Sequence, residues 1–281
     1  MGRRRRSTCR RPYARWAREP LPGAITLVDV PKPVIVDVAP LAAARPVLSG
    51  DLAGAAQAAA AIGPFDTVLF DLDGTLTDPE VGITSSYRYA LAAVGHPTHP
   101  DTDISWVIGP PLAENLTLLG VPDADLTVAM DAYRRRHLDV GLYEAELVPG
   151  IIELLRALDS AGVRLGLATA KPVLEGTLTL EHFGLADYFT VIGGNTDDGT
   201  RSKADVVAEA LRLLGGPEPA RVAMVGDRRH DIEGAAQNGV TSVGVAWGFA
   251  VDGELLAAGA DHVVESVAEL ASLLWGTTAR H

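Results

Sequence analysis

The sequence predicts an α/β protein, in which a parallel sheet carries helices on both faces and an all-helical segment is inserted after the first strand. Three observations predict this fold: short apolar runs alternate with helical patterns from about residue 64, polar residues stand where several runs stop, and one interval, about 79–148, lacks strands. Alternating strands and helices form parallel sheets, because each parallel connection needs a crossover. With 281 residues and 47% hydrophobic content, the chain is long enough for a substantial core.

Each expected strand is a short run of apolar residues that stops at a glycine or a polar residue. In order, these runs are 67–71, 163–169, 189–192, 222–226, 242–246 and 262–264. Each expected helix repeats apolar residues at intervals of three and four, as one face of a helix requires. In order, these helices are 151–161, 174–183, 203–214, 231–238, 254–258 and 267–274.

The interval 79–148 breaks this alternation. It begins with an amphipathic helix over 83–91, continues through the rigid bend Ile108-Gly109-Pro110-Pro111, and ends its last helix near 133–136. A helical segment directly after the first strand and turn can lie over the end of that strand and exclude water from it. We therefore expect an all-helical domain in this interval and no strand.

The first strand delivers two acidic residues, Asp71 and Asp73, just before a turn at Gly74. Side chains two apart in a strand point the same way, so the two carboxylates stand side by side and need a cation or a proton to coexist. Magnesium is the simplest such cation. The alternative is an ordinary buried strand that enters a turn, because an apolar run followed by Asp and Gly is also typical of that structure.

Other expected strands also end at polar residues. One run ends at Thr169, and another ends at Gly226-Asp227, with Asp231 four residues further on. In a parallel sheet these ends share one edge, where open α/β sheets bind their ligands. Residues far apart in the sequence are therefore expected to converge on Asp71.

These motifs resemble those of the haloacid dehalogenase superfamily of phosphohydrolases with an aspartate nucleophile, in the branch similar to phosphoglycolate phosphatases and 5'-nucleotidase-like enzymes. The four matching motifs are Asp71-Leu-Asp73-Gly-Thr-Leu-Thr-Asp, Thr169 in Leu-Ala-Thr-Ala-Lys, Lys203 in Arg-Ser-Lys-Ala-Asp, and Gly226-Asp227-Arg-Arg-His-Asp231. The resemblance runs from about residue 64 to about residue 274. It implies a Rossmann-like catalytic core at 64–78 and 149–281 and a helical cap domain at 79–148.

The resemblance gives each motif residue a role. It implies that Asp71 is the nucleophile and forms an aspartyl-phosphate, and that Asp73 protonates the leaving oxygen and then activates water. It also implies that Thr169 and Lys203 bind the phosphoryl oxygens. The implied cofactor is Mg2+, an ion that prefers oxygen ligands. Its implied ligands are Asp71, Asp73 through its backbone carbonyl, Asp227 and Asp231.

Five further residues are candidates for substrate binding: Gly109, Pro110, Arg88, Arg134 and Lys171. Gly109 and Pro110 lie in a bend that resembles a loop which family members lower onto the substrate. Either arginine could bind a second anionic group through its planar fork. Lys171 is one of only three lysines in a chain with 21 arginines, which favours a specific use for its compact charge. The alternative for these three cations is a place on solvated surfaces.

The predicted function is therefore a magnesium-dependent phosphatase that hydrolyses small phosphate monoesters, with phosphoglycolate or a nucleoside 5'-monophosphate as its substrate. An alternative is protein-tyrosine phosphotransfer, because the chain also resembles a mycobacterial protein of this fold described as a protein tyrosine kinase. That resemblance includes a basic tail, the motif-bearing body and the segment Ala246-Trp247-Gly248-Phe249. The sequence has no Gly-x-x-x-x-Gly-Lys loop and no kinase glycine-rich signature, which favours the phosphatase.

Charge is divided unevenly along the chain, whose net charge is −12. Residues 1–63 hold ten basic and four acidic residues and are expected to form a disordered arm, whereas the acidic body argues against nucleic-acid binding there.

The single cysteine, Cys9, excludes an intramolecular disulfide and fits a reducing compartment. Because no apolar window is long enough for a transmembrane helix and the basic start lacks a signal-peptide core, we expect a cytoplasmic protein with no membrane partner. The sequence leaves the oligomeric state open.

Overall fold

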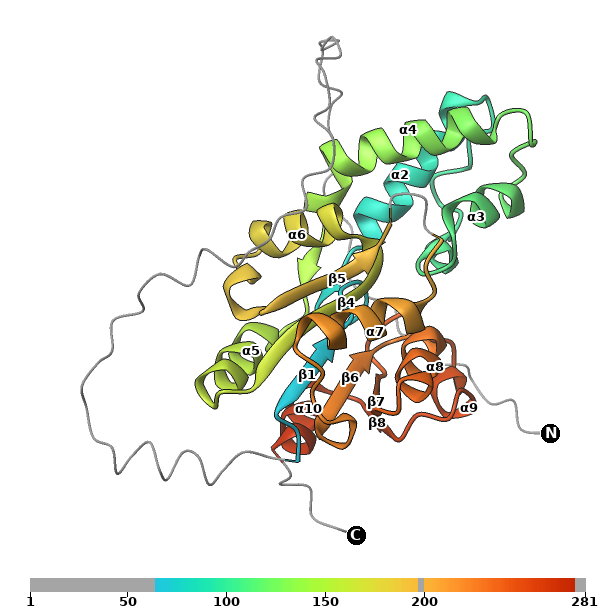
Figure 1. Ribbon diagram of the computed structural model, residues 1–281. Helices are drawn as coiled ribbons and strands as arrows, with labels where there is room; N and C mark the ends of the chain where they lie inside the picture. Colours follow the sequence, from blue (N-terminus) through green and yellow to red (C-terminus); the bar gives the residue numbers. More distant parts are fainter. Residues whose placement is uncertain (1–63, 197–199, 276–281) are drawn as a thin grey trace, which may run out of the picture. The chain divides into compact units, whose positions relative to one another are not determined.

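The computed structural model describes residues 64–196 and 200–275 (Figure 1). The expected arm at 1–63, with Cys9 and its basic residues, lies outside the described residues. Among the described helices, none has the length and apolar character needed to cross a membrane.

The centre of the fold is a sheet of six strands in the order β5-β4-β1-β6-β7-β8, and every neighbouring pair is parallel (Figure 1). The strands are β1 (Thr67–Phe70), β4 (Arg164–Pro172), β5 (Val191–Asn195), β6 (Val222–Gly226), β7 (Thr241–Val245) and β8 (His262–Val264). The predicted parallel α/β fold is confirmed. β4 continues three residues beyond the expected end at Thr169, so Thr169 lies within the strand.

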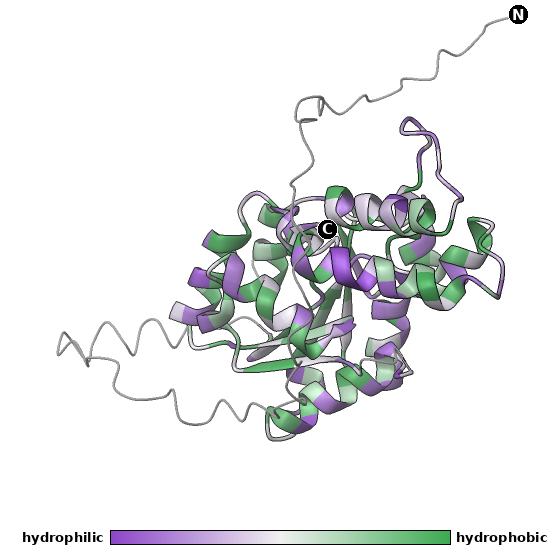
Figure 2. Ribbon diagram, turned by 90° about the horizontal axis from the view of Figure 1, so that it is seen from above, coloured by the Kyte–Doolittle hydropathy of each residue, from purple (hydrophilic) through white to green (hydrophobic). Residues whose placement is uncertain are grey.

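Two layers of helices cover the sheet because its side chains alternate between the faces. In β1, Val68 and Phe70 belong to a core cluster on one face, and Leu69 belongs to the cluster on the other. The first cluster includes side chains of α5 (Ile151–Ser160), α6 (Val173–His182) and α10 (Val267–Leu274), and the second includes those of α7 (Lys203–Leu213) and α8 (Arg229–Gln237). The helices carry both hydrophobic and hydrophilic residues, as helices between a core and solvent do (Figure 2).

The interval after β1 contains a helical insertion, hereafter the insertion, which spans residues 80–143 (cyan to green in Figure 1). Its elements are α2 (Glu80–Ala93), η2 (Ser105–Val107), α3 (Leu112–Leu118), α4 (Leu126–Asp139) and η3 (Gly141–Tyr143). The insertion has an apolar cluster of its own, to which Ile83, Tyr87, Leu91 and Leu116 contribute. The first helix includes the expected range 83–91, but two helices follow the bend where one was expected, and the last ends at Asp139 and not near 133–136.

One expectation for the interval 79–148 is wrong, because it contains a strand. β3 (Glu146–Leu147) pairs antiparallel with β2 (Thr77–Asp78), and the two form a separate two-stranded sheet where the chain leaves and re-enters the core. A pair of two-residue strands is too short to show a period in sequence. The remaining short elements are η4 (Ala186–Tyr188), η5 (Pro219–Arg221) and α9 (Glu254–Ala257).

Candidate active site

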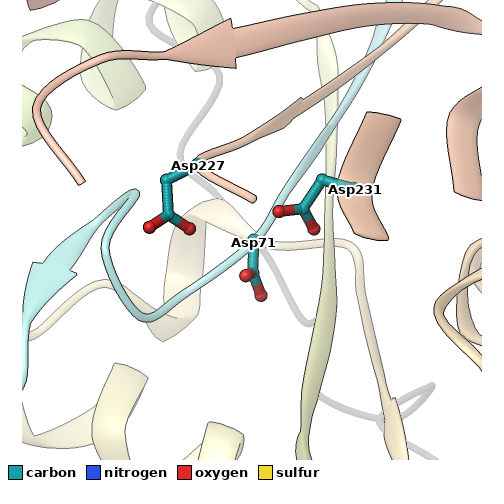
Figure 3. Close-up of side chains that lie close together, drawn as sticks. All are labelled: Asp71, Asp227 and Asp231. Atoms are coloured by element: carbon teal, nitrogen blue, oxygen red, sulfur yellow. The ribbon is translucent and has the colours of Figure 1, made fainter. Parts of the chain in front are cut away.

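Three buried carboxylates meet at the carboxyl edge of the sheet. Asp71 directly follows β1, Asp227 directly follows β6, and Asp231 lies in the first turn of α8. One carboxylate oxygen from each lies within 4.8 Å of the others, as the side chains in Figure 3 indicate. Because β1 and β6 are parallel neighbours, the residues that follow them emerge at the same edge. The structure thus brings together three of the four predicted metal ligands.

Glycines allow the backbone to approach these carboxylates closely. A Cβ atom on Gly74 or on Gly248 would collide with the Asp227 carboxylate, and one on Gly226 would collide with that of Asp231. Gly74 also has a φ of +80°, a backbone conformation that favours glycine. These three glycines therefore leave room for the acidic side chains.

Lys203 is the cation of this cluster. Its Nζ lies 2.9 Å from Asp71 Oδ1 and 2.7 Å from Asp231 Oδ1. Lys203 is the first residue of α7, and Ser202 with Asp205 forms the capping box that starts this helix. Burial lowers the pKa of Lys203, but the carboxylates of Asp231 and Asp71 overcome that effect and raise it above its usual value. The ammonium group is therefore charged.

One lysine does not balance three carboxylates. Burial, followed by the charges of Asp231 and Asp71, holds the pKa of Asp227 well above its usual range. Burial also raises the pKa of Asp231, to about 6, although Lys203 opposes the shift. Asp227 Oδ1 is buried and has no hydrogen-bond partner among the described residues. An excess of buried oxygen ligands with an unpartnered oxygen fits a hard divalent cation such as magnesium.

The second acid of the first motif is separate from this cluster. Asp73 Oδ2 accepts a hydrogen bond from Lys171 Nζ at 2.5 Å. Burial raises the pKa of Asp73 above its usual value, and Lys171 opposes the shift. Buried Thr169 accepts a hydrogen bond from the Lys171 backbone N–H at 3.2 Å, which leaves its own hydroxyl hydrogen free to donate. Asp73, Lys171 and Thr169 thus lie together at the ends of β1 and β4.

Comparison with known proteins identifies the family to which this site belongs. The haloacid dehalogenase-like hydrolase family matches residues 68–245 of the chain, the stretch that contains every motif above. The chain belongs to this family. The predicted resemblance to this family is confirmed.

Two curated relatives and one solved structure illustrate the similarity of this haloacid dehalogenase-like hydrolase to known proteins. A 5'-nucleotidase of Pseudomonas aeruginosa is 38% identical over 211 residues, which cover 75% of this chain and 96% of the relative. Tyrosine-protein kinase PtkA of Mycobacterium tuberculosis is 45% identical over 184 residues, or 65% of this chain, but the match spans only 62% of the relative's length. The crystal structure of a predicted phosphatase from Clostridium acetobutylicum has a TM-score of 0.67 and 38% identity, and the match covers 74% of this chain and 97% of that one.

In this haloacid dehalogenase-like hydrolase, the loop after β7 is a part of the site to which the sequence assigned no role. The backbone N–H of Phe249 donates to Asp227 Oδ2 at 2.7 Å, and Trp247 Nε1 donates to the Thr75 carbonyl at 3.2 Å. The signal that could have indicated this loop is its place after a parallel strand, at the same edge as Asp71.

The candidate substrate residues of the insertion are placed in different ways. Gly109 has a φ of +109°, and a Cβ atom there would lie 2.5 Å from Arg228 Nη1 of the core. Its neighbour Pro110 accepts a hydrogen bond at its carbonyl from Asn115 Nδ2 at 3.1 Å. The guanidinium of Arg88 donates to groups of the segment 98–102. Arg134 is exposed on α4. The substrate-binding roles of these residues, and that of Lys171, stay predictions.

Proposed function

We propose that this protein is a magnesium-dependent phosphatase that hydrolyses small phosphate monoesters through an aspartyl-phosphate on Asp71. The observation that carries this proposal is the meeting of three buried carboxylates, two of which pair with one lysine, beside a fourth acid that is paired with a second lysine. A phosphate monoester is a dianion, so a carboxylate can attack it only where positive charge offsets the repulsion.

Asp71, Asp227 and Asp231, with the backbone carbonyl of Asp73, would hold the magnesium ion. The ion would neutralise charge between the attacking carboxylate and the phosphoryl group. Asp71 is 8% exposed, whereas Asp227 is completely buried. Asp71 is therefore the member of the cluster that can meet a substrate, and Asp227 and Asp231 serve only as ligands.

The two steps divide between Asp71 and Asp73. In the first, an Asp71 oxygen bonds to phosphorus, the bond to the leaving oxygen breaks, and Asp73 gives its proton to that oxygen. In the second, the oxygen of a water molecule bonds to phosphorus while Asp73 takes a proton from it, the bond between phosphorus and the Asp71 oxygen breaks, and inorganic phosphate leaves with the Asp71 carboxylate regenerated. The raised pKa of Asp73, caused mainly by burial, supports its role as the acid. Lys171 limits this shift and so leaves Asp73 able to act as the base.

Two hydrogen-bond donors, the Thr169 hydroxyl and the Lys203 ammonium group, complete the site that would bind the phosphoryl oxygens. The Thr169 hydroxyl has a free hydrogen to donate, and Lys203 supplies a charged ammonium group beside Asp71. Both groups are held before substrate arrives, which is the condition for stabilising charge that develops during transfer. Their buried positions favour a role for both in holding the transferred group, not the leaving group.

For the leaving group, the insertion favours a nucleoside 5'-monophosphate over phosphoglycolate. A glycolate carboxylate needs a cationic partner, but two arginines of the insertion are already engaged: Arg88 with the segment 98–102, and Arg136 with Glu144 at 2.8 Å. The insertion also carries a half-buried tyrosine, Tyr133, whose ring packs against that of Tyr87 with centroids 4.7 Å apart. Burial holds the pKa of Tyr133 well above its usual range, so its side chain is a neutral group.

Protein-tyrosine phosphotransfer is the second candidate, favoured by the relative named as a tyrosine-protein kinase. It would use the same Asp71, with a protein tyrosine in place of water as the acceptor. An aryl leaving or accepting group would suit the same aromatic side chains. The two candidates differ in the fate of the phosphoryl group, which is released as inorganic phosphate in one and found on protein in the other.

A substrate panel tests both candidates. Purified protein is assayed for phosphate release from nucleoside 5'-monophosphates, phosphoglycolate, sugar phosphates and phosphotyrosine, with magnesium or with EDTA. We expect magnesium-dependent release and the highest kcat/KM for a nucleoside 5'-monophosphate. Arg134→Gln, which removes an exposed cation of α4, tests whether a substrate carboxylate binds there. Preference for phosphoglycolate with loss in Arg134→Gln would overturn the substrate assignment, and label transfer from ATP to protein without phosphate release would favour the second candidate.

A further inference from the structure

Two residues of the core connect the insertion to the acidic cluster in the same manner. Arg228 donates its backbone N–H to Asp231 Oδ2 at 3.0 Å, and Phe249 donates its backbone N–H to Asp227 Oδ2 at 2.7 Å. The side chains of both reach the insertion. Arg228 Nη1 donates to the Ile108 carbonyl at 2.6 Å, and Phe249 packs against the apolar cluster of the insertion. Each of these two carboxylates is thus held by a residue that also touches the insertion.

The guanidinium of Arg228 is oriented by Glu254. Its Nε donates to Glu254 Oε1 at 2.9 Å, and the two side chains are only 18% and 9% exposed. Glu254 also accepts the backbone N–H of Arg229 at 2.9 Å and that of Val251 at 3.1 Å. One carboxylate therefore joins the loop after β7 to the start of α8 and fixes the direction of Arg228. A guanidinium group held in this way loses little conformational entropy when it donates a hydrogen bond to a carbonyl.

The insertion provides a matching surface for this arginine. Gly109 follows Ile108, and a side chain at Gly109 would lie 2.5 Å from Arg228 Nη1. The loop itself is rigid, because Asn115 donates to the carbonyls of Val107 at 2.8 Å and Pro110 at 3.1 Å. The loop is therefore formed before Arg228 contacts it. Because Gly109 has no side chain, the guanidinium of Arg228 has room beside the loop.

We infer that Arg228, oriented by Glu254, is a positioning residue that latches the loop of residues 107–111 over the acidic cluster. Closure of the insertion and the placement of Asp231 then both depend on Arg228, the first through its guanidinium group and the second through its backbone N–H. Closure of a lid excludes water and completes a site for transfer. The consequence for turnover rests on the proposed phosphatase function, but the latch itself does not.

Hydrogen exchange tests the latch without substrate. The amides of Val107 and Ile108 donate to the carbonyls of Ile104 and Ser105, at 3.0 and 3.1 Å, in the turn that leads to the latched Ile108 carbonyl, so their exchange reports loosening of that turn. A hydrogen bond from a charged group to a neutral acceptor contributes enough that its loss should speed exchange of peptides covering 105–116 by about tenfold or more in Arg228→Gln. The matched control is Arg229→Gln, an exposed neighbour whose exchange should equal that of the wild type. Exchange that is unchanged in Arg228→Gln overturns the latch whatever the enzyme's activity.

Kinetics then test the positioning role. In Arg228→Gln the backbone N–H to Asp231 remains, so the magnesium concentration for half-maximal activity should stay constant while kcat/KM falls about tenfold to a hundredfold. Arg228→Lys should give an intermediate value, since an ammonium group can reach one acceptor but lacks the fork. If Arg228→Gln does not fold, Gly109→Ala perturbs the same contact from the insertion and should give the same faster exchange. Faster exchange with an unchanged kcat/KM would overturn the positioning role.

Discussion

Replacing Asp227 by Asn should stabilise the protein without magnesium and remove most of the stabilisation that magnesium provides. Asp227 is completely buried, and its carboxylate lies in a cluster whose oxygens are within 4.8 Å of one another. At an effective dielectric constant of about 20, two unit charges at such a distance repel by about 3 to 4 kcal/mol. Lys203 offsets part of this repulsion, so we expect a net gain of about 1 to 3 kcal/mol. An amide oxygen at this position can still accept the Phe249 N–H.

The sign of the pH dependence follows from the raised pKa. The folded protein binds a proton at Asp227 that the unfolded chain releases at lower pH, so the penalty is absent at low pH and complete above the folded pKa. The advantage of the Asn variant over the wild type should therefore begin to grow as the pH rises above about 4, the pKa of an unfolded Asp, and should be complete above the folded pKa. Burial is the first cause of the raised pKa, and the charges of Asp231 and Asp71 add to it.

Thermal unfolding in EDTA and in magnesium measures this effect. A gain of 1 kcal/mol corresponds to about 2 to 4 °C in a domain of this size, so the variant should melt several degrees higher in EDTA. Magnesium at about a hundred times its Kd should stabilise the wild type by about 2.7 kcal/mol and the variant far less. The exposed Asp252→Asn serves as the control and should respond as the wild type does. A variant that melts lower than the wild type in EDTA at high pH, or shows an equal magnesium shift, would refute the reasoning.

Three further substitutions test separate parts of the account. Asp71→Asn should reduce turnover on the order of 10⁴-fold or more, with folded structure retained by circular dichroism; full activity would contradict the covalent step. Lys203→Met leaves Asp71 and Asp231 without their cation. In EDTA it should lower the free energy of unfolding, measured with urea, by about 3 to 5 kcal/mol. An unchanged free energy of unfolding would show that the two ion pairs do not stabilise the protein. His137 is 3% exposed, and burial, with the charges of Lys171 and Arg136, lowers its pKa to about 2. Below about pH 6.5 the unfolded chain binds a proton at His137 that the folded protein does not bind. Lowering the pH to about 5 should therefore reduce the free energy of unfolding of the wild type by about 2 kcal/mol more than that of His137→Gln. An equal pH dependence of the free energy of unfolding in the two proteins would contradict this.

The sequence predicted the parts of the site that follow from the parallel sheet. Asp71 and Asp227 each stand directly after an apolar run, and parallel strands deliver the ends of such runs to one edge. Lys203 could be placed there only through the resemblance to the family, because its position at the start of α7 depends on a capping box and not on a strand. The helical character of the insertion was predicted from its periodicity, but the division between α3 and α4 was not.

Other features depend on contacts that no local pattern encodes. The ribbon of β2 and β3 joins two-residue strands, and Arg228 contacts Ile108 across 120 positions of the chain. The pairing of Lys171 with Asp73 spans 98 positions and requires β4 to continue beyond Thr169. In each case the partner is fixed by how the elements pack, so sequence spacing alone could name the residues but not their pairing.

The central claim is that Asp71 carries the phosphoryl group during turnover. The direct measurement is rapid acid quenching of the enzyme with magnesium and its preferred substrate, followed by mass spectrometry of the peptide that contains Asp71. The account predicts that this peptide gains the mass of a phosphoryl group in the wild type, and that the Asp71→Asn protein shows neither the gain nor phosphate release. Turnover that persists in Asp71→Asn, or a phosphoryl group trapped on another residue, would contradict the account.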